Sequence, residues 1–416
     1  MQVLIQQAKI TDTRSGFHNQ IVDILIEDGI IKDIAPSINA NADTVVKADG
    51  LCVSAGWTDI LADYREPGYE HKETIASGLR AAAAGGYTHV LTAPNTNPAV
   101  STKSIVQSLV QKAAGNIASL HPLGAITQDI EGKNLAEMLD MHAHGAVAFT
   151  DGWKPVQNAQ LMLKALEYVK SFNGTLVQIP VDSALATGGL MHEGPESVRL
   201  GMPGIPSLSE TILLYRDIEL LRYTGSRLHV TGISTAEGVE MIRNAKKEGL
   251  NITCSVTPYH LVLNDTALSG YSSMYKVMPP IRSEADRQAL LAGIADGTID
   301  CIASHHRPQE WDAKTKEYEY AADGMNIQEI AYNLVLQAVG AERVATLFTT
   351  ARDIFGLGNT NIEKGAVADM TLYTASGSRQ LDKMQSASAN NPFIGTVLQG
   401  KVVGIINNKQ VHLNQS

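Results

Sequence analysis

Cysteine is scarce in this sequence: the 416 residues include only three, Cys52, Cys254 and Cys301, and no C-x-x-C motif. An odd number of widely spaced cysteines excludes a disulfide framework, so we expect reduced, buried thiols in a cytoplasmic protein. Long apolar runs are absent too, since no stretch approaches the roughly 18 uninterrupted apolar residues of a membrane span. The opening MQVLIQQAKITDTRSG also lacks the apolar segment of a signal peptide. We therefore expect neither export nor a membrane span.

Basic charge is also in short supply. Lys and Arg number 33 against 43 Asp and Glu, which gives a net charge of −10 with His neutral. Phosphate binding draws on clustered basic side chains, so this balance argues against nucleic acid as a partner. What the sequence does contain is apolar material, because 44% of its residues are hydrophobic and only 18% are charged. That ratio excludes extensive disorder and predicts a globular chain with a large core.

The two ends of the chain share a pattern of short apolar strands joined by tight turns. Hairpin turns are expected at 27–29 and 407–408, each between apolar segments. Chain termini often lie close together, so these segments predict one small β-sandwich domain built from both ends of the chain. We expect that domain to contain residues 1–50 and 366–416, and a larger domain to occupy residues 51–365.

The middle of the chain alternates between strand-like and helix-like segments. Apolar runs predict strands at 53–62, 88–94, 121–127, 145–150, 175–180, 227–232, 251–256 and 299–304, and helical spacing appears at 74–86, 101–114, 208–223, 235–249 and 284–297. Eight short strands, mostly followed by helices, predict an α/β fold, specifically a (β/α)₈ TIM barrel. An open doubly wound sheet is the alternative, but no G-x-G-x-x-G follows the first strand.

Motifs along the chain carry a family resemblance. They include REPG at 65–68, APNTNP at 93–98, MHEG at 191–194, VTPYHL at 256–261, YKVMPPIR at 275–282 and IEKGAVADMTLY at 362–373. Over its whole length the chain resembles the dihydroorotases of the amidohydrolase superfamily, specifically the long type associated with aspartate carbamoyltransferase. The resemblance implies a role in pyrimidine biosynthesis, where this family reversibly closes carbamoyl aspartate to dihydroorotate with a metal-activated water. In a barrel of this kind the site lies at the C-terminal ends of the strands.

The resemblance also implies where the metal ligands should stand, and five of the six positions differ. The first-strand histidines correspond to Leu61 and Asp63, the fifth-strand histidine to Ile179, the sixth-strand histidine to Gly232, and the eighth-strand aspartate to His305. Only Asp151, the bridging acid of the fourth strand, matches. Leucine, isoleucine and glycine have no donor side-chain atoms, so we expect the metal centre, the catalytic group and the cofactor to be lost. Leu61 and Ile179 are expected to fill the emptied barrel mouth with apolar packing.

A rebuilt metal site is the alternative. Asp63, Asp151 and His305 stand at the ends of the first, fourth and eighth strands, and together they could hold one zinc ion, with His305 as the catalytic group. The chain would then remain an active dihydroorotase or a related cyclic amidohydrolase. The competing interpretation is that these three residues are hydrogen-bonded polar groups at the rim of an inactive site.

Arg65 and Asn95 match the arginine and asparagine that hold the substrate's carboxylate in the family. An arginine fork suits a carboxylate, so the pair predicts a ligand-binding site, and a carboxylate sensor is a further hypothesis for the chain. The clamp is incomplete, because Gln309 replaces its histidine and Met278 replaces the asparagine of the family's KVNPP motif. Pairing of Arg65 with a nearby acid is the structural alternative.

The leading hypothesis is a dihydroorotase-like protein of pyrimidine biosynthesis that keeps its barrel and lacks the family's chemistry. The resemblance to the long dihydroorotases implies that such a protein is a structural or regulatory partner of aspartate carbamoyltransferase. The sequence leaves open whether the chain also forms a homo-oligomer.

Overall fold

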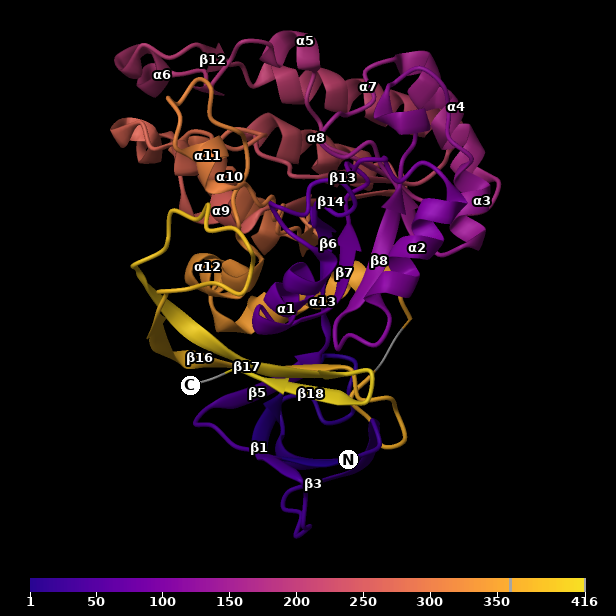
Figure 1. Ribbon diagram of the computed structural model, residues 1–416, viewed down its shortest axis with the longest axis vertical. Coiled ribbons are helices and arrows are strands. Elements are labelled where there is room, and N and C mark those ends of the chain that lie inside the picture. Colours follow the sequence, from indigo (N-terminus) through magenta and orange to yellow (C-terminus); the bar gives the residue numbers. More distant parts are fainter. Residues whose placement is uncertain (359–360, 415–416) are drawn as a thin grey trace.

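Two large β-sheets organise the protein in the computed structural model, which describes residues 1–358 and 361–414. One sheet curls into a barrel with helices around it, and the other forms a small β domain at the bottom of Figure 1. This architecture confirms the predicted (β/α)₈ barrel with an additional β domain. Within the described ranges, no helix has both the length and the apolar character needed to cross a membrane.

The barrel consists of eight parallel strands whose order in the sheet follows the chain. They are β6 Trp57–Ala62, β7 Tyr87–Thr92, β8 Ser119–Gly124, β9 Ala148–Phe149, β10 Leu176–Gln178, β13 Leu228–Thr231, β14 Ile252–Val256 and β15 Cys301–Ile302. A parallel bridge between Ala62 and His306 brings the segment after the last strand beside the first strand. Each barrel strand overlaps one of the eight predicted strands, because short apolar runs are the main signal of a buried parallel strand.

The first predicted strand, 53–62, is wrong in one respect, since the structure divides it in two. β5 Leu51–Ala55 belongs to the small β domain, and the barrel begins with β6 at Trp57. Gly56 lies between the two strands. A Cβ at this residue would lie 1.9 Å from Asp369 Oδ1, so a larger residue does not fit there. The chain therefore crosses between the domains at a point where only glycine fits.

Helices cover the outside of the barrel, as Figure 1 shows. The longer ones are α1 Ile75–Ala84, α2 Lys103–Ala113, α4 Ala159–Lys170, α7 Leu208–Thr224, α8 Ala236–Lys247, α10 Glu284–Ala295, α12 Ala331–Val339 and α13 Ala341–Phe355. The shorter ones are α3 Met138–Ala143, α5 Ser183–Ala186, α6 Pro195–Leu200, α9 Pro258–Val262 and α11 Trp311–Lys314. Val106, Leu109 and Ala113 recur at helical spacing on α2 and are its buried residues, which explains how such helices pack against the sheet.

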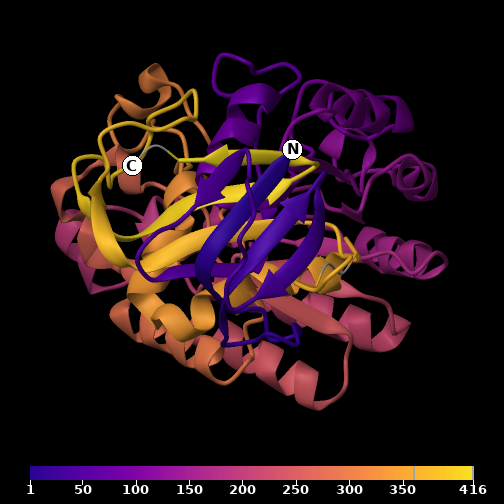
Figure 2. The ribbon, with the colours of Figure 1, turned by 90° about the horizontal axis from the view of Figure 1, so that it is seen from below.

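The small β domain draws its strands from both ends of the chain. Its strands are β1 Gln2–Ile10, β2 Ile21–Glu27, β3 Ile30–Ala35, β4 Thr44–Val46, β5 Leu51–Ala55, β16 Met370–Gln380, β17 Val397–Asn407 and β18 Gln410–Leu413. The sheet has the order β18-β17-β16-β5-β1-β2-β3, with β4 paired to β1. Figure 2 shows the indigo strands of the N-terminus beside the yellow strands of the C-terminus. The turns predicted at 27–29 and 407–408 join β2 to β3 and β17 to β18.

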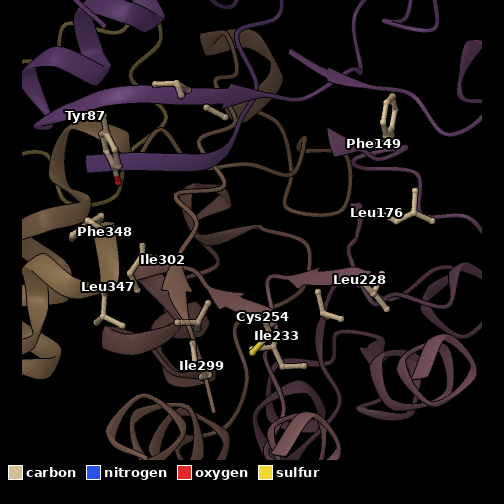
Figure 3. Packing of buried hydrophobic residues seen from close by; sticks show 14 of the residues in the cluster. Tyr87, Phe149, Leu176, Leu228, Ile233, Cys254, Ile299, Ile302, Leu347 and Phe348 are labelled. Atoms are coloured by element: carbon tan, nitrogen blue, oxygen red, sulfur yellow. The ribbon is translucent and has the colours of Figure 1, made fainter. Parts of the chain in front are cut away.

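The main core of the barrel lies between its strands and its helices. Figure 3 shows Tyr87, Phe149 and Phe348 among the buried side chains of this layer. A separate apolar cluster lies inside the barrel. The cysteines are free thiols, and Cys254 and Cys301 are buried in these clusters as predicted.

Candidate functional site

The C-terminal ends of the barrel strands contain the positions at which the resemblance places metal ligands. Leu61 on β6 is fully buried, and Ile179, directly after β10, is 2% exposed. Both belong to the apolar cluster inside the barrel, together with Leu91, Leu123 and Val177. Burying such a side chain stabilises the fold by about 1.5–3 kcal/mol, and no atom in it can bind a metal. Both side chains pack in this cluster as predicted, and Ile179 also lines a cavity at the mouth.

Gly232 follows β13, and the imidazole of His305 fills the space beside it. A Cβ at residue 232 would lie 2.5 Å from His305 Cε1, so a larger residue would collide with the ring. His305 Nε2 lies 2.8 Å from Thr231 Oγ1, whereas Nδ1 is buried with no hydrogen-bond partner among the described residues. Burial, with smaller effects from His260 and Arg307, lowers the pKa of His305 to about 3. The imidazole is therefore neutral near pH 7.

Asp151, the one matched ligand position, is held by the loop that follows β8. Its Oδ1 accepts hydrogen bonds from the backbone N–H groups of Ile126 at 2.9 Å and Thr127 at 3.0 Å. Its Oδ2 accepts a hydrogen bond from the Thr127 hydroxyl at 2.5 Å. Burial raises the pKa of Asp151 to about 6, although these hydrogen bonds favour its charged form. Both oxygens thus have protein partners that fix the loop.

Asp63, directly after β6, forms a buried ion pair. Its Oδ2 lies 3.0 Å from Arg65 Nη1 and accepts a hydrogen bond from Trp153 Nε1 at 2.7 Å. Its Oδ1 accepts a hydrogen bond from the backbone N–H of Arg65 at 3.2 Å. Asp63 is fully buried and Arg65 is 7% exposed, so salt and water screen this pair only weakly.

These partners leave no metal site in the barrel mouth. Within residues 1–358 and 361–414, no three His, Cys, Asp or Glu side chains are grouped so that they could hold an ion. Asp63, Asp151 and His305 contact different parts of the protein and are not brought together as the zinc ligands that the alternative hypothesis requires. The residues present therefore fit neither the family's metals nor the predicted mononuclear site.

Arg65, the first member of the predicted carboxylate clamp, is used by the protein itself. Its guanidinium pairs with Asp63, and its Nε donates to the carbonyl oxygen of Pro308 at 3.4 Å. Gln309, at the place of the clamp's histidine, is 3% exposed and accepts a hydrogen bond from Lys72 Nζ at 2.9 Å. The pairing with a nearby acid that was the structural alternative for Arg65 is the arrangement found.

Asn95, the second member of the clamp, binds the loop after β9. Its Nδ2 donates to the carbonyl oxygen of Asp151 at 3.0 Å, and its Oδ1 accepts a hydrogen bond from the backbone N–H of Trp153 at 3.2 Å. A Cβ at Gly152 would lie 1.9 Å from Asn95 Oδ1. The Asn95 amide thus occupies the space that a side chain at residue 152, where the family usually has a second aspartate, would need.

The sequence analysis missed two residues that shape the mouth, Trp153 and Arg307. The Arg307 Cζ lies 4.7 Å from the centre of the Trp153 ring, a distance at which the aromatic face attracts a cation. Both side chains line a cavity of about 240 Å³, together with Ile179 and Met278. Both residues stand in strand-end segments, FTDGW and SHHRPQ, so a search of these segments for aromatic and cationic side chains would have found them.

Comparisons with known proteins identify the family. A family model described as "Dihydro-orotase-like" matches residues 51–238. The dihydroorotase of Citrifermentans bemidjiense is 37% identical over 99% of each chain, and that of Pelobacter propionicus is 36% identical over 98% of each. The solved structure of the L-hydantoinase (dihydropyrimidinase) from Arthrobacter aurescens has a TM-score of 0.85 at 20% identity and shares the fold, with 100% of this chain and 97% of that chain covered. Because the identity to the dihydroorotases extends over the full length, the chain belongs to the dihydroorotase family.

Proposed function

We propose that this member of the dihydroorotase family has lost its ring-closing chemistry and acts in pyrimidine biosynthesis as a noncatalytic partner of aspartate carbamoyltransferase. One observation carries the loss of chemistry: Leu61 and Ile179 pack in an apolar cluster at two ligand positions, and His305 fills the space beside Gly232 at a third. Family membership supports the place in pyrimidine biosynthesis. The resemblance to the long, carbamoyltransferase-associated dihydroorotases supports the choice of partner.

The loss of activity follows from what the reaction needs. Opening a cyclic amide in this family uses a water that a metal has activated, together with an acidic group on the eighth strand that moves the proton. His305 stands at that strand end in place of the family's acidic group, and its Nε2 lies 2.8 Å from the Thr231 hydroxyl oxygen. The neighbouring side chains that replace the ligands supply no means of activating a water.

Turnover measurements test this loss. With zinc added, we expect the purified chain to interconvert carbamoyl aspartate and dihydroorotate no faster than buffer alone. The Citrifermentans bemidjiense dihydroorotase, 37% identical to this chain, is the control enzyme in the same assay. Turnover that disappears in Asp151→Ala would contradict the proposal, because it would show that the one matched ligand position still supports the chemistry.

A protein partner requires a surface, and helix α7 offers one. The helix buries one face against the barrel and exposes apolar side chains on the other. The exposed fractions are 58% for Leu208, 48% for Ile212, 60% for Tyr215 and 78% for Tyr223. These residues follow one another at steps of three, four or eight, which places them along one side of the helix. Exposed apolar side chains gathered in this way are typical of a protein interface.

Co-purification tests the partnership. We expect the chain to co-purify with the aspartate carbamoyltransferase of the same organism and to change its assembly or activity. The double variant Tyr215→Ser, Tyr223→Ser should weaken this association, whereas Tyr320→Ser, at a 68% exposed tyrosine outside α7, should not. Absence of both association and any effect on the carbamoyltransferase would refute the partnership and leave the loss of activity standing as a separate result.

A further inference from the structure

A cavity lined by apolar, aromatic and charged side chains opens beside the family's metal-ligand positions. Its volume is about 240 Å³, and apolar or aromatic walls are provided by Trp153, Ile179, Val181 and Met278. The guanidinium of Arg307 lies on the same wall as the indole of Trp153, 4.7 Å from the ring centre. Ligand sites commonly combine apolar walls with a few polar groups that fix the orientation of the ligand.

Arg307 carries a charge that no protein group neutralises by direct contact. Its Nε is buried without a hydrogen-bond partner, and its guanidinium has no carboxylate within 4.0 Å, in the part of the chain that the structure describes. Burial lowers the pKa of Arg307, and the charge of Asp323 on another part of the cavity wall opposes this effect. Arg65 provides the contrast, because its guanidinium is paired with Asp63. Arg307 is half-buried, and a partly buried cation without a partner is destabilising, so a ligand that brings a negative charge would relieve that cost.

We propose that this cavity binds a small organic carboxylate, with the carboxylate on Arg307 and an apolar or planar body against Trp153 and Met278. The fork of a guanidinium can donate two parallel hydrogen bonds to a carboxylate. The cavity has the volume of roughly eight water molecules, which limits the ligand to about ten non-hydrogen atoms. Trp153 also lines the cavity, so its indole ring offers aromatic surface to the uncharged part of the ligand.

The walls favour a carboxylate over inorganic phosphate. Phosphate carries charge on every side, so in this cavity some of its oxygens would face the Asp323 carboxylate or the apolar side chains of Ile179, Val181 and Met278. Removing charged oxygens from water without new hydrogen bonds is unfavourable. A carboxylate concentrates its charge at one end of the molecule, so it can place that charge on Arg307 and keep it away from Asp323, with its uncharged part against the apolar side chains of the wall.

This site differs from the clamp that Arg65 and Asn95 predict, since the protein itself engages both of those side chains. It also goes beyond the proposed partnership with aspartate carbamoyltransferase and does not depend on it. Ligand binding is measured on the isolated chain, whereas the partnership is measured by association of two proteins. Failure of one result therefore leaves the other intact.

Benzoate and benzamide test the requirement for charge, because these probes share a ring and nearly the same size. Isothermal titration calorimetry on the full chain should show benzoate binding about tenfold or more tightly than benzamide, as a charge-assisted pair predicts. Benzoate should also change the tryptophan fluorescence, and Trp153→Phe should abolish that change. Trp57 is fully buried in the main core and Trp311 is 74% exposed outside the cavity, so Trp153 is the tryptophan that reports on this site.

Variants of Arg307 decide whether the guanidinium is responsible. Arg307→Gln should weaken benzoate binding about tenfold or more, and Arg80→Gln, which removes the same charge from an exposed position on α1, should leave it unchanged. Arg307→Lys keeps the charge without the fork and should bind with intermediate affinity, which provides the test if the glutamine variant does not fold. The proposal is overturned if benzamide or inorganic phosphate binds as tightly as benzoate, or if Arg307→Gln binds benzoate like the unmodified chain. It is also overturned if benzoate does not bind at about 10 mM.

Discussion

Two arginines at the same barrel mouth have opposite surroundings. Arg65 is 7% exposed and pairs with Asp63 at 3.0 Å, whereas Arg307 rests on an indole ring and has no carboxylate in contact among the described residues. The first arrangement pairs a buried charge, whereas the second leaves a half-buried charge without a carboxylate partner. The part of the mouth around Arg65 is therefore packed like protein interior, whereas the part around Arg307 is an open cavity with the features of a binding site. The first part, called the filled floor, contains Leu61, Asp63, Arg65, Ile179, Gly232 and His305, and the second is the Arg307 cavity.

Trp153 lies between these two regions and contacts both. Its Nε1 donates to Asp63 at 2.7 Å, and its ring meets the His305 ring edge to face at 5.4 Å. The same ring contacts the Arg307 guanidinium on the cavity side. Apart from variants of Trp153 and Ile179, which line the cavity and also contact the floor, we expect changes in the floor to alter stability and changes at Arg307 to alter ligand binding.

Breaking the Asp63–Arg65 pair should have the largest effect on the floor. Asp63→Ala leaves the Arg65 guanidinium buried without its carboxylate and removes the acceptor of the Trp153 indole N–H. We expect the free energy of unfolding to fall by about 3–5 kcal/mol, measured by urea unfolding with circular dichroism. Asp49→Ala, at an exposed position, is the control. If the free energy of unfolding fell by less than about 1 kcal/mol, the pair would contribute no more than a surface ion pair, and the floor would not be packed like protein interior.

The contact between Gly232 and His305 should appear as a coupling between two variants. Gly232→Ala places a Cβ 2.5 Å from His305 Cε1 at a residue with φ +75°, so we expect a loss of about 2–3 kcal/mol. His305→Asn shortens that side chain, and asparagine tolerates the φ of 48° at residue 305. In the His305→Asn background, Gly232→Ala should therefore cost about 1 kcal/mol less in urea unfolding. Equal costs in both backgrounds would show that His305 does not fill the space beside residue 232.

The sequence predicts the elements of the fold because their signal is local. Val106, Leu109 and Ala113 mark the buried face of α2 by their spacing alone, and the apolar runs locate the barrel strands in the same way. The division of the first strand at Gly56 is different, since the side chain that excludes a Cβ there belongs to Asp369, far along the chain. A contact of that kind leaves no pattern in the residues around Gly56.

At the site, the sequence predicts the loss of the metal ligands better than it predicts the contacts of the side chains that are there. Leu61 and Ile179 cannot bind a metal in any arrangement, so their identity alone predicts the loss of the ligands. The partner of an arginine depends instead on which side chains meet across different strands. Arg65 forms an ion pair with Asp63, two residues away in the chain. The guanidinium of Arg307 instead contacts the ring of Trp153, which stands at the end of another strand. The difference between the surroundings of the two arginines is therefore seen in the structure and not in the sequence.

Asp151 should make the stability of the protein depend on pH in the acid range. Burial raises its pKa from 3.8 to about 6, so the folded chain holds this proton more tightly than the unfolded chain. The stabilisation from this group is fully present below the unfolded pKa and is lost as the pH rises through about 6, by about 1–3 kcal/mol. Unfolding at several pH values between about 4 and 7 should show this loss in the unmodified chain and its absence in Asp151→Asn. An identical pH profile for both proteins would mean that Asp151 is not protonated on folding.

Metal removal should have the smallest effect, because three ligand positions in the floor hold Leu61, Ile179 and Gly232. A metal present at about 1,000 times its dissociation constant would add about 4.1 kcal/mol of stability, so removing it would lower the Tm by several degrees. Here we expect excess EDTA to shift the Tm by less than about 1 °C and added zinc to leave it unchanged. The Citrifermentans bemidjiense dihydroorotase treated in the same way provides the comparison for a relative that is 37% identical. A fall in Tm of several degrees with EDTA, reversed by zinc and abolished by Asp151→Ala, would contradict this prediction. It would mean that the floor rearranges to bind a metal and that its apolar packing does not exclude one.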